Sequence, residues 1–282
     1  IGRMPFFDAV CHSLSTLSTG GFSTRNDGMA AFSSPYIIAV MTLFMLFAGT
    51  NPTMFYFAFK RNFRKISGNN EFRAYVILAA SFAVIVAFVL YISSDIPAFK
   101  SIQAGFFHVI SLITTTGYYI MDWNKWTYLL LMIVFVLMFM GGMSGSASGG
   151  VKIVRLMIIA LNSRNENRRL VHPDAYLPVR VDKKLVQPNI VYNLLIFMIL
   201  YFITVSAGSF LLSFFGYDIN TAFSTTASML ANIGPGIGTF GPFSDYSGMH
   251  EAAKWILSLL MLTGRLELFA VIILFTGSFY KN

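Results

Sequence analysis

Long apolar runs alternate along the chain with short segments that carry charges. Five of these runs supply, or nearly supply, the roughly 20 residues that a helix needs to cross about 30 Å of hydrocarbon. They cover residues 36–59, 74–94, 126–141, 185–217 and 255–280. The first four contain no charged residue, whereas the fifth contains Arg265 and Glu267. The pattern predicts five membrane-spanning helices.

Three further apolar runs are shorter and end in small polar residues and glycine. Residues 6–21, 102–117 and 221–236 each hold about three apolar helical turns, followed by a segment that cannot remain helical. Irregular backbone at membrane depth is tolerated only where it is buried in protein or lines a cavity. We therefore predict three re-entrant half-helices, each followed by an extended strand.

The three short runs form part of an internal repeat. They align on Gly20, Gly117 and Gly234, which are 97 and 117 residues apart. The unit is a helix, a re-entrant loop and a second helix, and it occurs two and a half times. Because the first unit lacks its leading helix, we expect the chain to be a fragment of a longer protein. The predicted fold class is an all-α integral membrane protein whose tandem helix–re-entrant pore loop–helix repeats surround a central ion pore, as in potassium channels.

Composition agrees with a membrane location. Of the 282 residues, 56% are hydrophobic and 11% are charged, whereas a soluble domain carries about 25% charged residues. So few charges cannot cover a globular surface. The single cysteine, Cys11, excludes a secreted scaffold held by disulfides.

The basic residues, which give a net charge of +8, are concentrated in two segments. Residues 60–73 and 152–184, with Lys281, contain 14 of the 20, whereas the turns beside the re-entrant loops contain 5 basic and 7 acidic residues. The positive-inside rule places the basic segments and the C-terminus in the cytoplasm, so that the loops enter from the outer side. Topology and contact with membrane lipids explain the basic stretch, or it docks a cytosolic partner; nucleic acid is not expected.

The re-entrant loops have the chemistry of a cation filter. A half-helix that ends in mid-membrane directs its C-terminal carbonyls, and the negative end of its dipole, at that depth. Rings of backbone carbonyls replace the hydration shell of a large monovalent cation, and four loops around an axis can close such a ring. Because the side chains differ between loops, we expect the backbone carbonyls to bind the ion. The predicted filter comprises the carbonyls of Ser18, Thr19, Thr115, Thr116, Asn232 and Ile233, with Gly20, Gly117 and Gly234 as the filter glycines.

The chain resembles the Trk/Ktr/HKT family of potassium transporters, and most closely the bacterial TrkH-type membrane subunits, over essentially its whole length. The resemblance rests on the repeat and on four strings: Ser-Thr-Gly-Gly-Phe at 18–22, Thr-Thr-Gly-Tyr at 115–118, Asn-Ile-Gly-Pro-Gly at 232–236 and Gly-Arg-Leu-Glu at 264–267. It implies potassium uptake through a pore of four pseudo-equivalent repeats. This chain would then hold the second repeat without its leading helix (1–65), the third repeat (66–165), a cytoplasmic basic linker (166–189) and the fourth repeat (190–282).

The same resemblance implies a cellular setting. The protein would be a multi-pass protein of the plasma (cell inner) membrane, with a cytoplasmic C-terminus. It would form a homodimer that is controlled by a cytosolic ring of nucleotide-binding regulatory subunits. Potassium would be the transported ligand and the one metal bound, and no cofactor is expected in this chain.

A glycine- and serine-rich stretch, 141–150, interrupts the apolar run that begins at residue 126. It is not a Walker loop, because no glycine directly precedes Lys152. One interpretation is a close helix crossing built from small residues. The other, which the resemblance favours, is an intramembrane gate below the filter. The gate residues would be Gly141, Gly142, Ser144, Gly145, Ser146, Gly149 and Gly150, together with Arg265.

Arg265 lies inside an apolar run, where a central arginine costs about 2.5–3.5 kcal/mol, so it is a candidate functional residue. Glu267 is not its natural partner, because residues i and i+2 do not face each other on a helix. The arginine either anchors a neighbouring helix or faces the gate. In the second case we expect its guanidinium to donate to loop carbonyls and hold the loop across the pore.

Other classes of function are weaker. The Gly-x-Gly-x-x-Gly spacing at 236–241 has no strand before it, so it does not predict a dinucleotide site. The histidines, His12, His108, His172 and His250, are scattered and are expected to be structural. The alternative to a cation pore is a membrane-embedded enzyme or an organic-substrate transporter. That alternative needs buried catalytic groups, and Glu267 is expected to be the only internal acid, so an enzyme is not expected.

Overall fold

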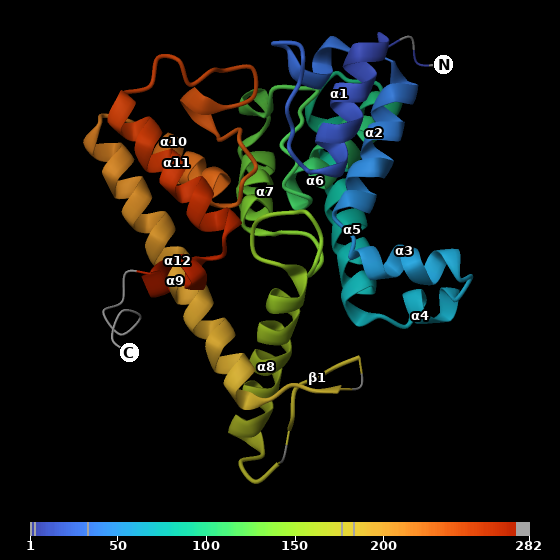
Figure 1. Ribbon diagram of the computed structural model, residues 1–282, viewed down its shortest axis with the longest axis vertical. Coiled ribbons are helices and arrows are strands. Elements are labelled where there is room, and N and C mark those ends of the chain that lie inside the picture. Colours follow the sequence, from blue (N-terminus) through green and yellow to red (C-terminus); the bar gives the residue numbers. More distant parts are fainter. Residues whose placement is uncertain (1, 3, 33, 176, 183, 275–282) are drawn as a thin grey trace.

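A computed structural model describes residues 2, 4–32, 34–175, 177–182 and 184–274 (Figure 1). Its helices are α1 (Phe6–Leu17), α2 (Pro35–Ala48), α3 (Pro52–Phe59), α4 (Phe63–Ser67), α5 (Asn70–Ser93), α6 (Ala98–Ile113), α7 (Tyr128–Phe139), α8 (Ile153–Val171), α9 (Pro188–Phe214), α10 (Ile219–Leu230), α11 (Glu251–Arg265) and α12 (Leu268–Leu274). Its strands are β1 (Arg180–Val181) and β2 (Lys184–Leu185), and short 3₁₀ turns lie at Gly28–Ala31, Trp123–Lys125 and Gly238–Phe240.

The three predicted half-helices are α1, α6 and α10. Each is 12 to 16 residues long, and each ends where the run of small polar residues begins. Proline precedes α1 and α6, and Asp218 caps α10 by accepting a hydrogen bond from the backbone N–H of Thr221. Prolines and acidic caps suit helix N-termini, because the first backbone N–H groups have no acceptor within the helix.

Two of the predicted spanning helices are continuous. The 24-residue α5 and the 27-residue α9 are long and apolar enough to cross a membrane, and the bent pair α2–α3 counts as a third span if it is taken together. Both long helices expose apolar side chains along one face, as Ile77, Phe88 and Ile92 do on α5. Such faces are stable against lipid rather than against water.

The prediction of one helix over 36–59 is wrong. α2 and α3 meet at an angle of 103° across Gly49–Asn51. Asn51 caps α3 by accepting from the backbone N–H of Thr53, and Pro52 occupies the first helical position. Proline has no N–H to donate to the preceding turn, so this sequence ends one helix and starts another.

The last helix of each repeat is interrupted in the same way. α7 has 12 residues, about 18 Å of helix, and stops before the inner loop (140–152), after which α8 begins. The predicted continuous helix 255–280 is also wrong, because α11 ends at Arg265 and Glu267 has a φ of +66° before α12. Arg265 is therefore at a helix end. Residues 275–280 of that prediction lie outside the described residues.

A short hairpin adds to the predicted all-α fold. β1 and β2 pair antiparallel, with Arg180 opposite Leu185 and Val181 opposite Lys184. In Figure 1 the hairpin lies beside α8, at the end of the molecule opposite the N-terminus. The predicted boundaries at 65, 165 and 189 fall inside α4, α8 and α9, and the division into repeats itself stays a prediction.

Helices α5 and α6 pack through small residues. A Cβ added to Gly105 would lie 2.7 Å from the backbone nitrogen of Ala87 and 2.8 Å from the carbonyl oxygen of Ala83. This contact fixes α6 against the long helix α5, and the largest apolar cluster of the described residues continues from it to α7. The position of the second half-helix therefore depends on Gly105.

We predict that Gly105→Leu separates α5 from α6 and lowers stability by about 1–3 kcal/mol, since overpacking forces a backbone shift. Gly248→Leu is the matched control, because a Cβ at Gly248 meets nothing within 4 Å. The measurement is thermal unfolding of both full-length variants in the same detergent. Equal melting temperatures for the two would show that the helix crossing has room for a side chain.

Candidate ion-conduction site

The three half-helices end with the same backbone geometry. The second residue after each helix is left-handed: Thr19 has a φ of +53°, Thr115 of +52° and Asn232 of +61°. Two residues further on, each loop has a glycine with positive φ, at +68°, +81° and +108°. These equivalent glycines are Gly21, Gly117 and Gly234, which are 96 and 117 residues apart. The predicted extended strand is thus interrupted by left-handed residues, because the chain must turn out of the helix.

The alignment of the first loop on Gly20 is therefore wrong by one residue. The backbone N–H of Gly20 donates to the carbonyl of Ser15 at 2.7 Å. Thr116 and Ile233 donate in the same way to Ser111 and Ser228, at 2.9 and 2.8 Å. Gly20 thus corresponds to the residues before the other glycines, and Ser18 caps α1. Two adjacent glycines in the sequence hid this register.

The loops contact one another in sequence order. A Cβ added to Gly21 would lie 1.9 Å from the carbonyl oxygen of Thr116, and one added to Gly117 would lie 1.9 Å from that of Ile233. At Gly234 an added Cβ would meet nothing within 4 Å. The structure thus brings together the predicted residues of all three loops, and one side of the third loop has no such neighbour among the described residues.

Serine hydroxyls hold the backbone just beyond the glycines. Ser111 Oγ donates to the carbonyl of Tyr118 at 2.7 Å, and Ser228 Oγ donates to that of Pro235 at 2.8 Å. In the first loop the equivalent hydroxyl, Ser15 Oγ, accepts from the backbone N–H of Phe22 at 2.8 Å. Each half-helix thus fixes the loop that follows it through a serine side chain.

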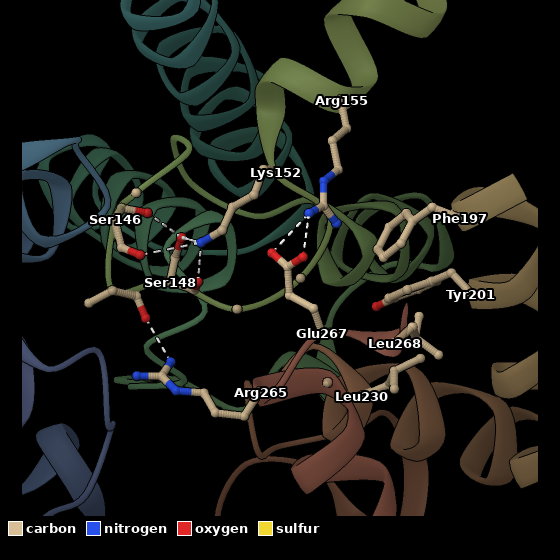
Figure 2. A pocket seen from close by; sticks show the side chains of 15 residues that line it. Ser146, Ser148, Lys152, Arg155, Phe197, Tyr201, Leu230, Arg265, Glu267 and Leu268 are labelled. Carbon is tan, nitrogen blue, oxygen red and sulfur yellow. Dashed lines mark hydrogen bonds and ion pairs between the residues drawn. The ribbon is translucent and has the colours of Figure 1, made fainter. Parts of the chain in front are cut away.

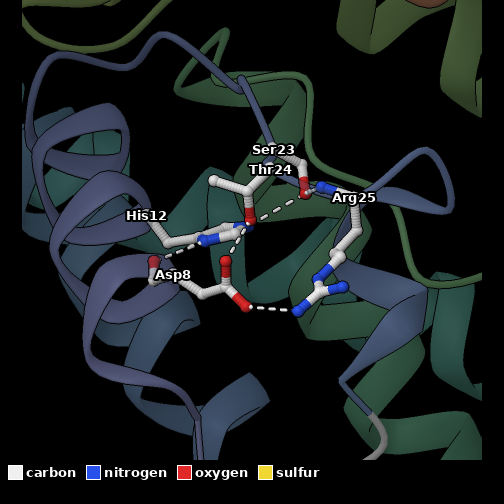
Figure 3. Close-up of polar contacts among 5 residues, drawn as sticks. All are labelled: Asp8, His12, Ser23, Thr24 and Arg25. Carbon is white, nitrogen blue, oxygen red and sulfur yellow. Dashed lines mark hydrogen bonds and ion pairs between the residues drawn. The ribbon is translucent and has the colours of Figure 1, made fainter.

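A polar cluster fastens the first loop to α1 (Figure 3). His12 Nδ1 lies 2.7 Å from the carbonyl oxygen of Asp8, and its Nε2 lies 3.0 Å from Ser23 Oγ. The buried Asp8 carboxylate accepts from Thr24 Oγ1 at 2.7 Å and from the Arg25 guanidinium at 3.0 Å. The buried side chains of Asp8 and His12 thereby have hydrogen-bond partners, as burial requires.

His108 performs the same task in the second loop. Its Nδ1 lies 2.8 Å from the carbonyl oxygen of Ala104, and its Nε2 accepts from the backbone N–H groups of Ile120 and Met121 at 3.3 Å. These contacts agree with the structural role that was expected for His12 and His108. Sequence reasoning treated the two as scattered, although they are 96 residues apart, the true repeat spacing.

The inner loop lies directly against the ends of all three half-helices. Thr19 Oγ1 donates to the carbonyl of Ala147 at 3.0 Å, and the backbone N–H of Gly149 donates to Thr115 Oγ1 at 2.6 Å. A Cβ added to Gly149 would lie 2.2 Å from the carbonyl oxygen of Ala231. The loop therefore lies under the place where the three re-entrant loops meet.

The predicted gate residues are brought together within this loop. The backbone N–H of Gly141 bonds the carbonyl of Val151 at 2.8 Å, and that of Gly142 bonds Ser148 Oγ at 2.9 Å, which closes the loop. Ser146 Oγ lies 2.7 Å from Ser148 Oγ. Gly145 and Gly150 have positive φ values of +78° and +63°, which glycine adopts without strain.

Arg265 reaches the inner loop, as predicted. Its Nη1 donates to the carbonyl of Ala147 at 2.8 Å, so this oxygen accepts from both Arg265 and Thr19. Glu267 pairs instead with Arg155 at 2.8 Å, as Figure 2 shows. The contact predicted for Arg265 is confirmed, and its role in gating stays a prediction.

A family model described as TrkH, a cation transport protein, matches residues 1–281. The chain belongs to the TrkH family. It is 34% identical, over its whole length, to the Trk system potassium uptake protein TrkI of Halomonas elongata, and covers 58% of that protein. It is 31% identical to TrkH of Salmonella typhimurium, over 99% of this chain and 58% of that one.

A solved structure agrees. The potassium transporter TrkH from Vibrio parahaemolyticus superposes with a TM-score of 0.92 at 30% identity, over 99% of this chain and 60% of that one. The TrkH-family chain therefore has the predicted potassium-channel-like membrane fold, in a family of transporters rather than enzymes. It spans about three fifths of the length of these relatives.

A cavity of about 260 Å³ lies beside the inner loop (Figure 2). Lys152 donates to Ser148 Oγ at 3.1 Å and to the carbonyls of Ser146 and Ser148, which holds the end of the loop. On the other side of the cavity, the Arg155 guanidinium stacks 4.2 Å from the ring of Phe197 on α9. Together with Arg265, these residues give the cavity three basic side chains, and Glu267 gives it one carboxylate.

The expectation that Glu267 is the only internal acid is wrong. Asp8 and Glu71 are both buried, and Glu71 is 8% exposed. Sequence reasoning placed Glu71 in a cytoplasmic segment, because several basic residues precede it. Among the described residues there is no group of three or more histidine, cysteine or acidic residues that could hold a metal ion.

An exposed acid lies next to a residue that contacts the third re-entrant loop. Hydrogen bonds from the hydroxyl and backbone N–H of Ser247 lower the pKa of Asp245 below its usual value. The neighbouring Tyr246 hydroxyl donates to the carbonyl of Gly234 at 2.9 Å, so this charge lies close to the third loop. A negative charge here raises the local cation concentration.

The corrected register makes a prediction for the first loop. Gly21→Ala should lower cation uptake by the full-length protein at least about tenfold, because a strained φ costs about 1–3 kcal/mol and the new methyl meets a carbonyl. Gly20→Ala should stay within about twofold of wild type, since φ is ordinary there and side chains surround the site at 3.3 Å. The measurement is uptake corrected for membrane abundance. A larger loss for Gly20→Ala would restore the original alignment.

Proposed function

We propose that the protein containing this chain takes up potassium across the plasma membrane through a filter of backbone carbonyls, gated by the inner loop. The observation that carries the proposal is the contact between consecutive loops at Gly21–Thr116 and Gly117–Ile233. Three loops in this order form three sectors of a ring, and the open side of Gly234 is where a fourth loop would complete it. A first repeat outside this chain would supply that loop.

The ion-binding groups in this proposal are carbonyl oxygens. They belong to Thr19, Gly20, Thr115, Thr116, Asn232 and Ile233, with Gly20 replacing Ser18 because of the corrected register. Their carbonyls would replace the hydration shell of potassium, which is held less tightly than that of a smaller cation. The names of the relatives, which are potassium uptake proteins, support potassium as the ion.

The inner loop is the proposed gate. It touches Thr19, Thr115 and Ala231, so an ion leaving the three loops would meet it first. The Arg265 guanidinium adds a positive charge at the same place and holds the Ala147 carbonyl. Electrostatic repulsion and occlusion would therefore act together on one barrier.

The proposed setting follows the charge distribution. The loop that holds Asp245 would face outward, and the basic residues of α4, α8 and the hairpin would face the cytoplasm. Those basic residues would contact lipid headgroups and a cytosolic ring of nucleotide-binding regulatory subunits, on a homodimer in the cell inner membrane. The C-terminus would be cytoplasmic, and Lys281, used in that assignment, lies outside the described residues.

Rubidium uptake into cells that lack their own potassium uptake systems tests the function. Cells expressing the full-length protein should accumulate rubidium, whereas cells expressing Gly117→Val should not, because its Cβ would collide with the Ile233 carbonyl. Gly248→Val is the control, because its Cβ meets nothing. Rubidium uptake by the Gly117→Val protein at the wild-type rate would refute the carbonyl filter.

The gate makes a separate prediction. Arg265→Ala and a deletion of 144–148 should each raise potassium flux several-fold, because each weakens the closed loop. The double variant should show less than the sum of the two effects, since both act on one barrier. Flux is measured in the full-length protein and corrected for expression. Unchanged flux in both single variants would leave helix packing as the role of the loop.

A further inference from the structure

Glu71 is a buried carboxylate that neither the filter nor Arg265 uses. It lies in the first turn of α5, and its Oε1 accepts a hydrogen bond from the backbone N–H of Ser144 at 2.5 Å. Ser144 belongs to the inner loop, 73 residues away in sequence. Glu71 therefore attaches the loop to the first turn of α5.

The peptide groups next to this bond are held as well. The Ser144 carbonyl accepts from Asn51 Nδ2 at 2.6 Å, and the backbone N–H of Met143 donates to the Gly49 carbonyl at 2.9 Å. Met143 is itself fully buried in the apolar cluster. Residues 143 and 144 are thus a fixed part of the loop, three residues before the carbonyl of Ala147 that lies under the half-helices.

The same turn of α5 is held from the other side by the hairpin. Asp182, in the turn between β1 and β2, accepts from the backbone N–H of Asn70 at 2.7 Å and from Asn69 Nδ2 at 3.0 Å. The N–H of Asn70 has no acceptor within its own helix, and a carboxylate at a helix N-terminus is favourable. The hairpin, α5 and the inner loop are therefore linked at adjacent residues of the first turn of α5, where Asn70 binds the Asp182 carboxylate and Glu71 binds the loop.

We propose that Glu71 is a positioning residue that holds the inner loop under the half-helices, and that Asp182 couples this hold to the hairpin. A partner that displaces the hairpin would withdraw Asp182 from the first turn of α5. That turn would loosen, and Ser144 would lose its acceptor. The consequence for ion flow rests on the proposed gate, whereas the hold itself does not.

Hydrogen exchange in the full-length protein tests the hold without any ion flux. In Glu71→Ala, amides of the inner loop should exchange about tenfold faster or more, because the backbone N–H of Ser144 loses its hydrogen-bond acceptor. Glu71→Gln keeps a carbonyl acceptor and should give a smaller rise. Asp182→Ala should also raise the exchange of the loop, and the double alanine variant should exchange no faster than Glu71→Ala, since Asp182 acts through Glu71.

Glu166→Ala is the matched control, because that carboxylate pairs with Arg169 on the exposed face of α8 and should leave the loop unchanged. Loop exchange within twofold of wild type in Glu71→Ala would overturn the hold. A rise in that variant with none in Asp182→Ala would overturn the coupling. If Glu71→Ala does not fold, Glu71→Gln must still exceed the control. Faster loop exchange with unchanged potassium flux would keep the hold and reject the gate.

Discussion

Three helices end in the interior of this membrane protein, and the backbone beyond each must find hydrogen-bond partners without help from lipid or bulk water. The rest of the site follows from this constraint. Serines at equivalent positions of α1, α6 and α10 bond the backbone just after Gly21, Gly117 and Gly234. His12 and His108 hold the next turn. The irregular loops are thus supported by side chains from the helices that precede them.

The same constraint places the inner loop. Its backbone lacks the regular hydrogen bonds of a helix. Its hydrogen-bond partners come instead from the half-helices, from Arg265 and from α5. The Ala147 carbonyl shows the result, because it accepts from both Thr19 and Arg265. Contacts that satisfy the backbone of the inner loop in its present position also hold it beneath the re-entrant loops. In the gate that we propose, the interactions that stabilise the inner loop are therefore the same ones that keep it closed.

Much of the fold could be read from the pattern of apolar residues. The half-helices, the long helices α5 and α9 and the repeat all follow from run length and from small polar residues at the ends of runs. The interruption at 141–150 was predicted, whereas the breaks within 36–59 and 255–280 were missed, although Asn51-Pro52 carried a capping signal. The break after Arg265 had no comparable signal, because it depends on the tertiary contacts of Gly264 and Glu267.

The register at Gly20–Gly21 could not be chosen from one sequence, since either glycine fits the motif, and the 96-residue spacing of two histidines was the unused clue. The burial of Glu71 arises from the inner loop, which lies far from it in sequence.

The most direct test of the carbonyl filter is anomalous scattering from rubidium in crystals of the full-length protein. We expect rubidium on an axis where the carbonyl oxygens of Gly20, Thr116 and Ile233 converge, with a fourth loop completing the ring. Gly117→Val crystals grown with the same salt should lack that peak. Rubidium bound elsewhere, with these carbonyls turned away from it, would contradict the filter.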